Sequence, residues 1–180
     1  MNNKLDKIRL VITDIDGVLT DGSLYYDANG EALKCFHVRD GLGIRMLIES
    51  GIQVAVLSGR DSAILRKRIA DLGIELFLLG KLEKETACHQ LIAQAGVTAE
   101  ETAYIGDDSV DLPAFAVCSF SAAVADAPDY VKQAADRTLT LAGGKGAFRE
   151  LSDLILAVQD KDQIYRSAQG FLTAVKKMAQ

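Results

Sequence analysis

Residues 10–22 of this chain read LVITDIDGVLTDG, an apolar run that passes directly into two aspartates and a glycine. The run 10–12 is typical of a fully buried strand, and Asp14 and Asp16 follow at its carboxyl end. In an open parallel sheet the ligand crevice lies beyond the carboxyl ends of the strands. Aspartate and glycine are also ordinary turn residues, so a plain acidic turn is the alternative interpretation. The residues that follow the other strands decide between the two.

The composition is that of an ordinary globular protein, with 180 residues, 49% hydrophobic and 25% charged, and a net charge of −5. This acidic balance disfavours a nonspecific nucleic-acid binder, which needs a basic face. The three cysteines form no CxxC motif and fit a reducing compartment. No apolar run reaches the roughly 18 residues of a membrane span, and the first residues lack the apolar core of a signal peptide. We therefore expect one cytoplasmic domain over residues 1–180, without a membrane or nucleic-acid partner.

Strand-like and helix-like segments alternate along the rest of the chain. Apolar runs at 54–57, 76–79 and 102–105 are separated by segments of helical periodicity, and further strands are expected at 118–121 and 137–141. Such alternation predicts an α/β fold, a Rossmann-like parallel sheet with flanking helices and right-handed crossovers.

Capping residues predict where three of these helices begin. Asp40 is expected to cap a helix that runs to Ser50, and Asp61 one that ends at Gly73. A third helix is expected over residues 81–95.

A β-hairpin is expected between the first strand and the first of these helices. Aromatic and apolar residues in 23–38 flank the dipeptide Asn29-Gly30, which is a strong hairpin turn signal. Because an isolated hairpin is only marginally stable, this one should pack on another surface.

Polar residues also follow the other strands, and the topology places them on one edge of the sheet. Ser58 ends the second strand, Lys84 lies in the first turn of a helix, and Asp107, Asp108 and Asp111 follow a later strand. Clustered carboxylates repel one another unless a cation joins them, and ligation by oxygen alone suits Mg²⁺. A hydroxyl and an ammonium are good partners for a phosphoryl group. Each residue alone could be a turn acid or a solvated lysine, but together they predict magnesium-assisted phosphoryl transfer.

Four segments resemble the motifs of haloacid dehalogenase superfamily phosphatases, in order and in spacing. They are DIDGVLTD at 14–21, LSGR at 57–60, Lys84, and GDDSVD at 106–111. Two further segments, FHVRDGLGI at 36–44 and GGKGAFRE at 143–150, are similar to those of members that act on the 8-phosphate of an eight-carbon keto sugar acid. The resemblance implies a haloacid dehalogenase-like phosphatase in lipopolysaccharide biosynthesis.

The resemblance also implies roles for the residues of the first motif. Asp14 would be the nucleophile and form an aspartyl-phosphate, which splits one hard displacement into two easier ones. Asp16 would protonate the departing sugar oxygen and then activate water for the second step. Mg²⁺ would be held by Asp14, the Asp16 backbone carbonyl and Asp107.

The remaining motif residues would support these groups. Ser58 and Lys84 would hold the phosphoryl oxygens, and Asp108 and Asp111 would lie in a second layer around the metal. Phosphatases of nine-carbon keto acids in this superfamily tend to carry Glu at the position of Arg60, so the arginine favours the eight-carbon substrate.

The spacing of the motifs leaves no room for a cap domain. Only 16 residues separate Gly22 from Arg39, and Arg60 lies 24 positions before Lys84. Because enclosure strengthens electrostatic catalysis, either a large substrate or another subunit must cover the crevice. The resemblance implies a homotetramer that associates through the hairpin.

Arg60 and Arg68 are candidates to bind the carboxylate of a keto sugar acid, because a planar guanidinium can hold a carboxylate by two hydrogen bonds. Arg68 lies about 12 Å beyond Arg60 along a helix that rises ~1.5 Å per residue, so a neighbouring subunit could present either one. Two solvated helix arginines are the alternative interpretation.

Three other functions remain open at this point. They are a phosphatase of a nine-carbon keto acid phosphate, a phospho-acceptor receiver domain, and a non-catalytic scaffold that assembles through the hairpin. In a receiver domain the accepting aspartate would end a middle strand, but here Ser58 ends that strand. A scaffold would not need the complete set of acids, serine and lysine.

Overall fold

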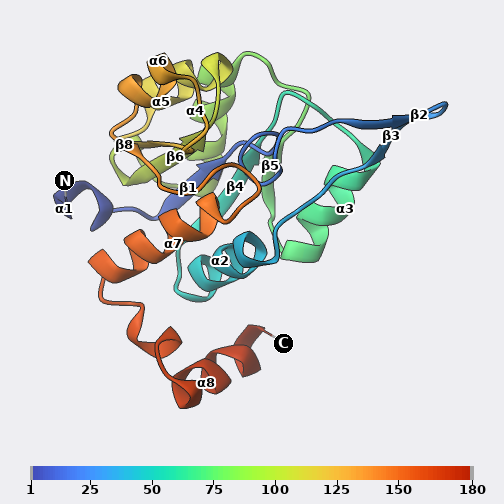
Figure 1. Cartoon of the computed structure of the whole chain (residues 1–180). Helices are drawn as coiled ribbons and strands as arrows, with labels where there is room; N and C mark the ends of the chain where they lie inside the picture. Colours follow the sequence, from blue (N-terminus) through green and yellow to red (C-terminus); the bar gives the residue numbers. More distant parts are fainter. Residues whose placement is uncertain (1, 179–180) are drawn as a thin grey trace.

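The computed structural model describes residues 2–178 (Figure 1). Its centre is a parallel sheet of six strands in the order β5-β4-β1-β6-β7-β8 among the described residues. The strands are β1 (Leu10–Thr13), β4 (Gln53–Leu57), β5 (Leu76–Leu78), β6 (Thr102–Gly106), β7 (Phe120–Ala123) and β8 (Arg137–Thr138). β1 is buried throughout and lies between β4 and β6, to which it pairs in parallel. The predicted α/β fold is confirmed.

Helices cover both faces of this sheet. Figure 1 shows α4, α5 and α6 on one face and α2 and α7 on the other, with α8 packed outside α2. The helices are α1 (Asn2–Leu5), α2 (Val38–Glu49), α3 (Ala63–Leu72), α4 (Lys84–Ala95), α5 (Leu112–Val117), α6 (Asp129–Ala134), α7 (Ala147–Val158) and α8 (Ala168–Met178). Three short 3₁₀ helices are η1 (Ala99–Glu101), η2 (Ser109–Asp111) and η3 (Gln163–Tyr165). None of the helices in residues 2–178 is long and apolar enough to cross a membrane.

The predicted hairpin is present as β2 (Tyr25–Asp27) and β3 (Gly30–Leu33), which pair in antiparallel fashion. The Asp27 side chain accepts a hydrogen bond from the Asn29 N–H at 2.7 Å and closes the turn. Figure 1 shows the hairpin projecting from the body of the molecule. Its large side chains are exposed, Tyr26 to 61% and Leu33 to 53%. These apolar side chains are therefore left uncovered by this chain, although the Tyr26 hydroxyl accepts a hydrogen bond from Arg60.

The prediction that Asp40 caps the first long helix is wrong. The helix α2 begins at Val38, and its cap, His37, lies three residues before the predicted one and accepts a hydrogen bond from the Arg39 N–H. Asp40 is buried inside the first turn, where its Oδ1 accepts a hydrogen bond from the Arg149 N–H at 2.9 Å. The Asp40 carboxylate therefore binds the start of α7, although the capping preference of aspartate predicts that it caps α2.

The prediction that Asp61 caps the second helix is also wrong by one residue. Ser62 is the cap of α3 and accepts a hydrogen bond from the Leu65 N–H. Asp61 instead binds the Arg66 guanidinium through both carboxylate oxygens, at 2.8 and 2.5 Å. Because Arg66 binds the Asp61 carboxylate, the Ser62 hydroxyl caps the helix instead.

Other predicted boundaries move by a few residues. The helix expected from residue 81 begins at Lys84, because the Glu83 side chain caps it through the Thr86 N–H. The strand expected at 118–121 lies two residues later, since Cys118 still closes α5 through Ala114. β8 is shorter than the strand expected at 137–141.

Candidate active site

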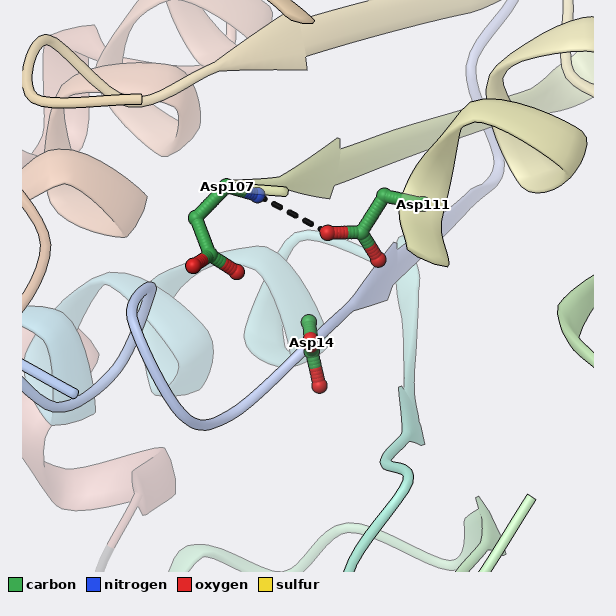
Figure 2. A group of neighbouring side chains, drawn as sticks. All are labelled: Asp14, Asp107 and Asp111. Carbon is green, nitrogen blue, oxygen red and sulfur yellow. Dashed lines mark hydrogen bonds between the residues drawn. The ribbon is translucent and has the colours of Figure 1, made fainter. Parts of the chain in front are cut away.

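Three carboxylates meet at the carboxyl edge of the sheet (Figure 2). Asp14 follows β1, Asp107 follows the neighbouring strand β6, and Asp111 ends η2. One oxygen of each lies within 4.8 Å of the others. The Asp107 N–H also donates a hydrogen bond to Asp111 Oδ2 at 2.9 Å, drawn as the dashed line in Figure 2. The parallel topology brings these acids together as the strand ends predicted.

Burial and mutual repulsion disfavour the ionised forms of the carboxylates in this cluster. Burial raises the pKa of Asp14 to about 7, with Lys84 opposing the shift and Asp111 adding to it. Burial also raises the pKa of Asp107 to about 8, and the charges of Asp14 and Asp111 raise it further. A divalent cation would stabilise the ionised forms, and the donors are all oxygen, as Mg²⁺ prefers. The residues present therefore fit a magnesium ion.

Lys84 supplies one buried positive charge to the cluster. Its Nζ lies 2.7 Å from Asp14 Oδ2 and 2.6 Å from Asp111 Oδ1, and its side chain is fully buried. Burial by itself lowers the pKa of Lys84, but the charges of the two carboxylates outweigh burial and hold the pKa above its usual value. Lys84 is therefore a charged ammonium in direct contact with Asp14.

Asp111 holds the site together, because both of its oxygens are fully engaged. Tyr104 donates its hydroxyl to Asp111 Oδ1 at 2.8 Å, beside the Lys84 ammonium. The N–H groups of Asp107 and Asp108 donate to Asp111 Oδ2 at 2.9 and 3.2 Å. Sequence reasoning missed Tyr104, although a tyrosine in an otherwise apolar buried strand signals that its hydroxyl needs a partner.

Ser58 lies at the end of β4, the other neighbour of β1, and is buried. Its Oγ accepts a hydrogen bond from the Arg60 N–H at 3.2 Å. Within residues 2–178 the hydroxyl proton has no acceptor, so it can donate to an oxygen of a ligand.

Asp16 is half-buried and faces the base of the hairpin rather than the three-carboxylate cluster. Lys34 donates a short hydrogen bond to Asp16 Oδ1, and Arg60 Nε lies 3.8 Å from Oδ2. Arg60 also donates to the Tyr26 hydroxyl at 2.7 Å. Sequence reasoning missed Lys34, because no local pattern indicates that a hairpin lysine folds back onto the first motif.

Two glycines allow the loops around the site to approach closely. Gly17 has φ +90°, and a Cβ there would lie 2.1 Å from the Asp107 carboxylate. A Cβ on Gly143 would lie 1.9 Å from the Gly17 carbonyl oxygen. Gly144 donates its N–H to the Val18 carbonyl at 2.9 Å. The glycine-rich segment 143–146 thus supports the loop that carries Asp16.

Asp108 and Arg68 lie outside this cluster. The Asp108 side chain caps η2 by accepting a hydrogen bond from the Ser109 N–H at 2.6 Å, and its own N–H binds Asp111. The Arg68 guanidinium stacks on the Phe36 ring, 5.3 Å from the ring centroid, and its Nε is buried without a hydrogen-bond partner in the described chain. Arg68 is half-buried on α3, whereas Arg60 lies before the start of that helix, so the expectation that both arginines lie along one helix is wrong.

Comparison with known proteins shows a consistent set of relatives. The family profile of haloacid dehalogenase-like hydrolases matches residues 78–146. The chain is 71% identical over 180 residues, all of both chains, to the 3-deoxy-D-manno-octulosonate 8-phosphate phosphatase KdsC of Haemophilus influenzae. It is 47% identical over 154 residues to KdsC of Yersinia pestis, covering 86% of this chain and 82% of that one.

Solved structures agree with these relatives. The cobalt-bound deoxy-D-mannose-octulosonate 8-phosphate phosphatase of Haemophilus influenzae matches with a TM-score of 0.93 and 73% identity, covering 94% of this chain and 99% of that one. The phosphatase of Moraxella catarrhalis in complex with a magnesium ion, a phosphate ion and KDO matches with a TM-score of 0.88 and 36% identity. That match covers 91% of this chain and 94% of the other.

Proposed function

This chain belongs to the 3-deoxy-D-manno-octulosonate 8-phosphate phosphatases of the haloacid dehalogenase-like hydrolases, and on this premise we propose that it hydrolyses that phosphate monoester. The products are the free keto sugar acid and phosphate, and the reaction depends on magnesium. One observation carries the proposal, namely the buried Asp14 carboxylate in contact with Lys84 and beside Asp107 and Asp111. This arrangement suits attack by a carboxylate on a phosphoryl group whose negative charge is offset by the lysine and by a magnesium ion.

The metal site follows from the same residues. Asp14 and Asp107 would hold Mg²⁺ with their carboxylates, and Asp16 would add its backbone carbonyl. When bound, the ion supplies positive charge that offsets the negative oxygens of the phosphoryl group.

The chain's own side chains carry the two chemical steps. Asp14 attacks phosphorus and forms an aspartyl-phosphate, while Asp16 gives a proton to the departing sugar oxygen. Asp16 then takes a proton from water, and this water attacks the aspartyl-phosphate and releases phosphate. Ser58 and Lys84 hold the phosphoryl oxygens during both steps, and Asp111 fixes Lys84 in position.

The arginines favour a keto acid over a simple sugar phosphate. Arg60 lies beside Asp16, where the leaving sugar departs, and is partly exposed. Arg68 rests on Phe36 near the base of the hairpin. We propose that both arginines bind the substrate carboxylate, with Arg68 contributed by a neighbouring subunit.

The exposed hairpin supports the association of several copies of this chain. Tyr25 and Leu33 pair across the two strands and are both exposed, so they form an apolar surface suited to a second copy of the chain. We propose that residues 1–180 form one catalytic domain, that four copies associate through their hairpins, and that the assembly works in the cytoplasm.

A substrate panel tests the function. Purified protein with Mg²⁺ should release phosphate from the eight-carbon keto acid phosphate with a higher kcat/KM than from a nine-carbon analogue or from p-nitrophenyl phosphate. EDTA should abolish release and Mg²⁺ restore it. A receiver domain or a scaffold would show no turnover on any ester, and preference for the nine-carbon ester would reassign the substrate.

A further inference from the structure

Lys34 is a buried lysine that the two-step chemistry leaves without a role. It follows β3 at the base of the hairpin, and its side chain is only 1% exposed. A buried ammonium is costly unless it is paired. Its two partners are Asp16 Oδ1 and Glu31 Oε1, the second at 3.0 Å. The hairpin therefore brings a positive charge directly onto the acid–base residue.

The two oxygens of Asp16 have different surroundings. Oδ1 accepts the hydrogen bond from Lys34. Oδ2 is buried without a hydrogen-bond partner among the described residues, and the Arg60 Nε is 3.8 Å away. Among the described residues, only Oδ1 of Asp16 is held by a hydrogen bond.

We infer that Lys34 is a positioning residue for proton transfer, and this inference rests on the proposed function. By holding Oδ1, Lys34 fixes the Asp16 carboxyl group so that Oδ2 carries the proton. In the first step the proton leaves Oδ2 for the sugar oxygen as the bond from phosphorus to that oxygen breaks. In the second step Oδ2 takes a proton from the attacking water. Lys34 itself gives up no proton.

The local charges support this arrangement. When Asp16 is ionised, as it is before it takes the proton from water, Lys34 and Arg60 balance the charges of Asp16 and Glu31. Without Lys34, two carboxylates would face each other with only Arg60 at 3.8 and 3.9 Å, and Asp16 would turn toward that guanidinium. Oδ2 would then be occupied rather than free.

The leaving group distinguishes this role from a merely structural one. A sugar alkoxide is a poor leaving group and needs a proton, whereas p-nitrophenolate leaves without one. Formation of the aspartyl-phosphate from the sugar phosphate should therefore depend on Lys34, and its formation from p-nitrophenyl phosphate should not.

Rapid-quench measurement of aspartyl-phosphate formation, at saturating Mg²⁺, tests the inference on the full-length protein. Lys34→Met keeps the length of the side chain and removes the charge. We expect it to slow phosphorylation by the octulosonate phosphate at least ~10-fold, a fraction of the usual contribution of a general acid. Phosphorylation by p-nitrophenyl phosphate should change less than about threefold by the same argument. Lys34→Arg should restore most of the sugar phosphate rate, because it keeps the charge and the donors.

Three variants serve as controls. Lys7→Met removes an exposed lysine before β1 and should leave both rates unchanged. Lys34→Gln takes the place of Lys34→Met if the latter fails to fold, with folding checked by circular dichroism. Asp16→Asn should reproduce the selective loss on the sugar phosphate.

The outcomes separate the inference about Lys34 from the proposed phosphatase function. Equal losses on both substrates, or no loss on either, would overturn the role of Lys34 while leaving the phosphatase assignment intact. If Asp16→Asn leaves sugar phosphate turnover unchanged, the proposed acid is wrong, and the inference about Lys34 fails with it.

Discussion

The buried acid cluster and the exposed hairpin are the two most distinctive regions of this molecule. They differ in whether this chain itself supplies the partners of their side chains. Asp14, Lys84 and Asp111 pair with one another within the chain and are almost completely buried. Tyr26 and Leu33 on the hairpin are more than half exposed. One chain supplies all the side chains of the cluster, whereas it leaves the apolar surface of the hairpin uncovered.

This difference follows from the cost of each kind of burial. A buried charge without a partner is expensive, so the chain must pair the charges of the cluster internally. An apolar strand surface can stay exposed until another molecule covers it. The hairpin reaches the motif loops beside the cluster through Lys34, which contacts Asp16, and through Tyr26, which contacts Arg60. We therefore expect the chemistry to depend on single buried residues and the enclosure of the substrate to depend on assembly.

The largest expected effect concerns the nucleophile. Asp14→Asn keeps the shape of the side chain but removes the attacking charge, so turnover should fall by at least about 10³-fold, on the scale of losing a covalent nucleophile. The trapped phospho-enzyme should disappear as well. Phosphate release and acid-quenched labelling measure the two effects.

Asp129→Asn is the matched control for this substitution, because that side chain is 87% exposed and forms an ion pair with the neighbouring Lys132 on the same helix. Its turnover should equal that of the unchanged protein. Substantial turnover by pure Asp14→Asn protein would eliminate Asp14 as nucleophile.

The next effect concerns the metal and pH. Without metal, burial raises the pKa of Asp107 to about 8 and that of Asp14 to about 7. Mg²⁺ must therefore displace protons at pH 6 but fewer at pH 8.5, so its affinity should rise as pH rises through this range. Titration calorimetry in two buffers of different ionisation enthalpy should show proton release at pH 6.5.

Asp107→Asn sharpens this test, since the amide has no proton to release. It should weaken Mg²⁺ binding about 10-fold or more by removing a charged ligand, on the scale of losing a partner of a charged group. It should also flatten the dependence of affinity on pH. An affinity in the unchanged protein that does not vary between pH 6 and 8.5 would contradict the metal site.

Sequence reasoning succeeded where topology alone places the residues. Asp14, Ser58 and Asp107 follow neighbouring parallel strands, so their meeting requires only the order of strand and helix. It failed where a side chain chooses between local and distant partners. Asp40 binds the start of α7 instead of capping α2, and Lys34 folds back onto Asp16. These contacts depend on where a distant segment of the chain lies. The hydrophobic periodicity within one segment carries no information about that position.

A smaller effect concerns the exposed apolar pair of the hairpin strands. Tyr25 and Leu33 pair across the strands, and replacing both with serine should remove the apolar surface without touching Lys34. We expect dissociation to smaller species, with the dissociation constant raised at least about 10-fold, because buried aromatic anchors dominate such interfaces. Turnover of p-nitrophenyl phosphate should change less than turnover of the keto acid phosphate.

Leu172→Ser removes an equally exposed apolar side chain on α8 and serves as the control for this pair. Light scattering measures the size of each species at assay concentration. A wild-type chain that is entirely monomeric there would end the proposal of assembly through the hairpin.

The smallest expected effect concerns Arg68. Its guanidinium is held against the Phe36 ring, and its Nε is buried with no hydrogen-bond partner in the part of the chain that the structure describes, so the planar group is already ordered before a ligand arrives. An ordered guanidinium loses little freedom when it binds a carboxylate through two hydrogen bonds. Arg68→Ala should therefore raise KM for the octulosonate phosphate about 10-fold, the worth of one charge-assisted contact, with kcat less changed. KM for a phosphate ester without a carboxylate should stay the same. Arg66→Ala, which removes an exposed arginine of the same helix paired to Asp61, should alter neither constant. Equal increases in KM on both esters would show that Arg68 only packs against the base of the hairpin, and the substrate carboxylate would then depend on Arg60 alone.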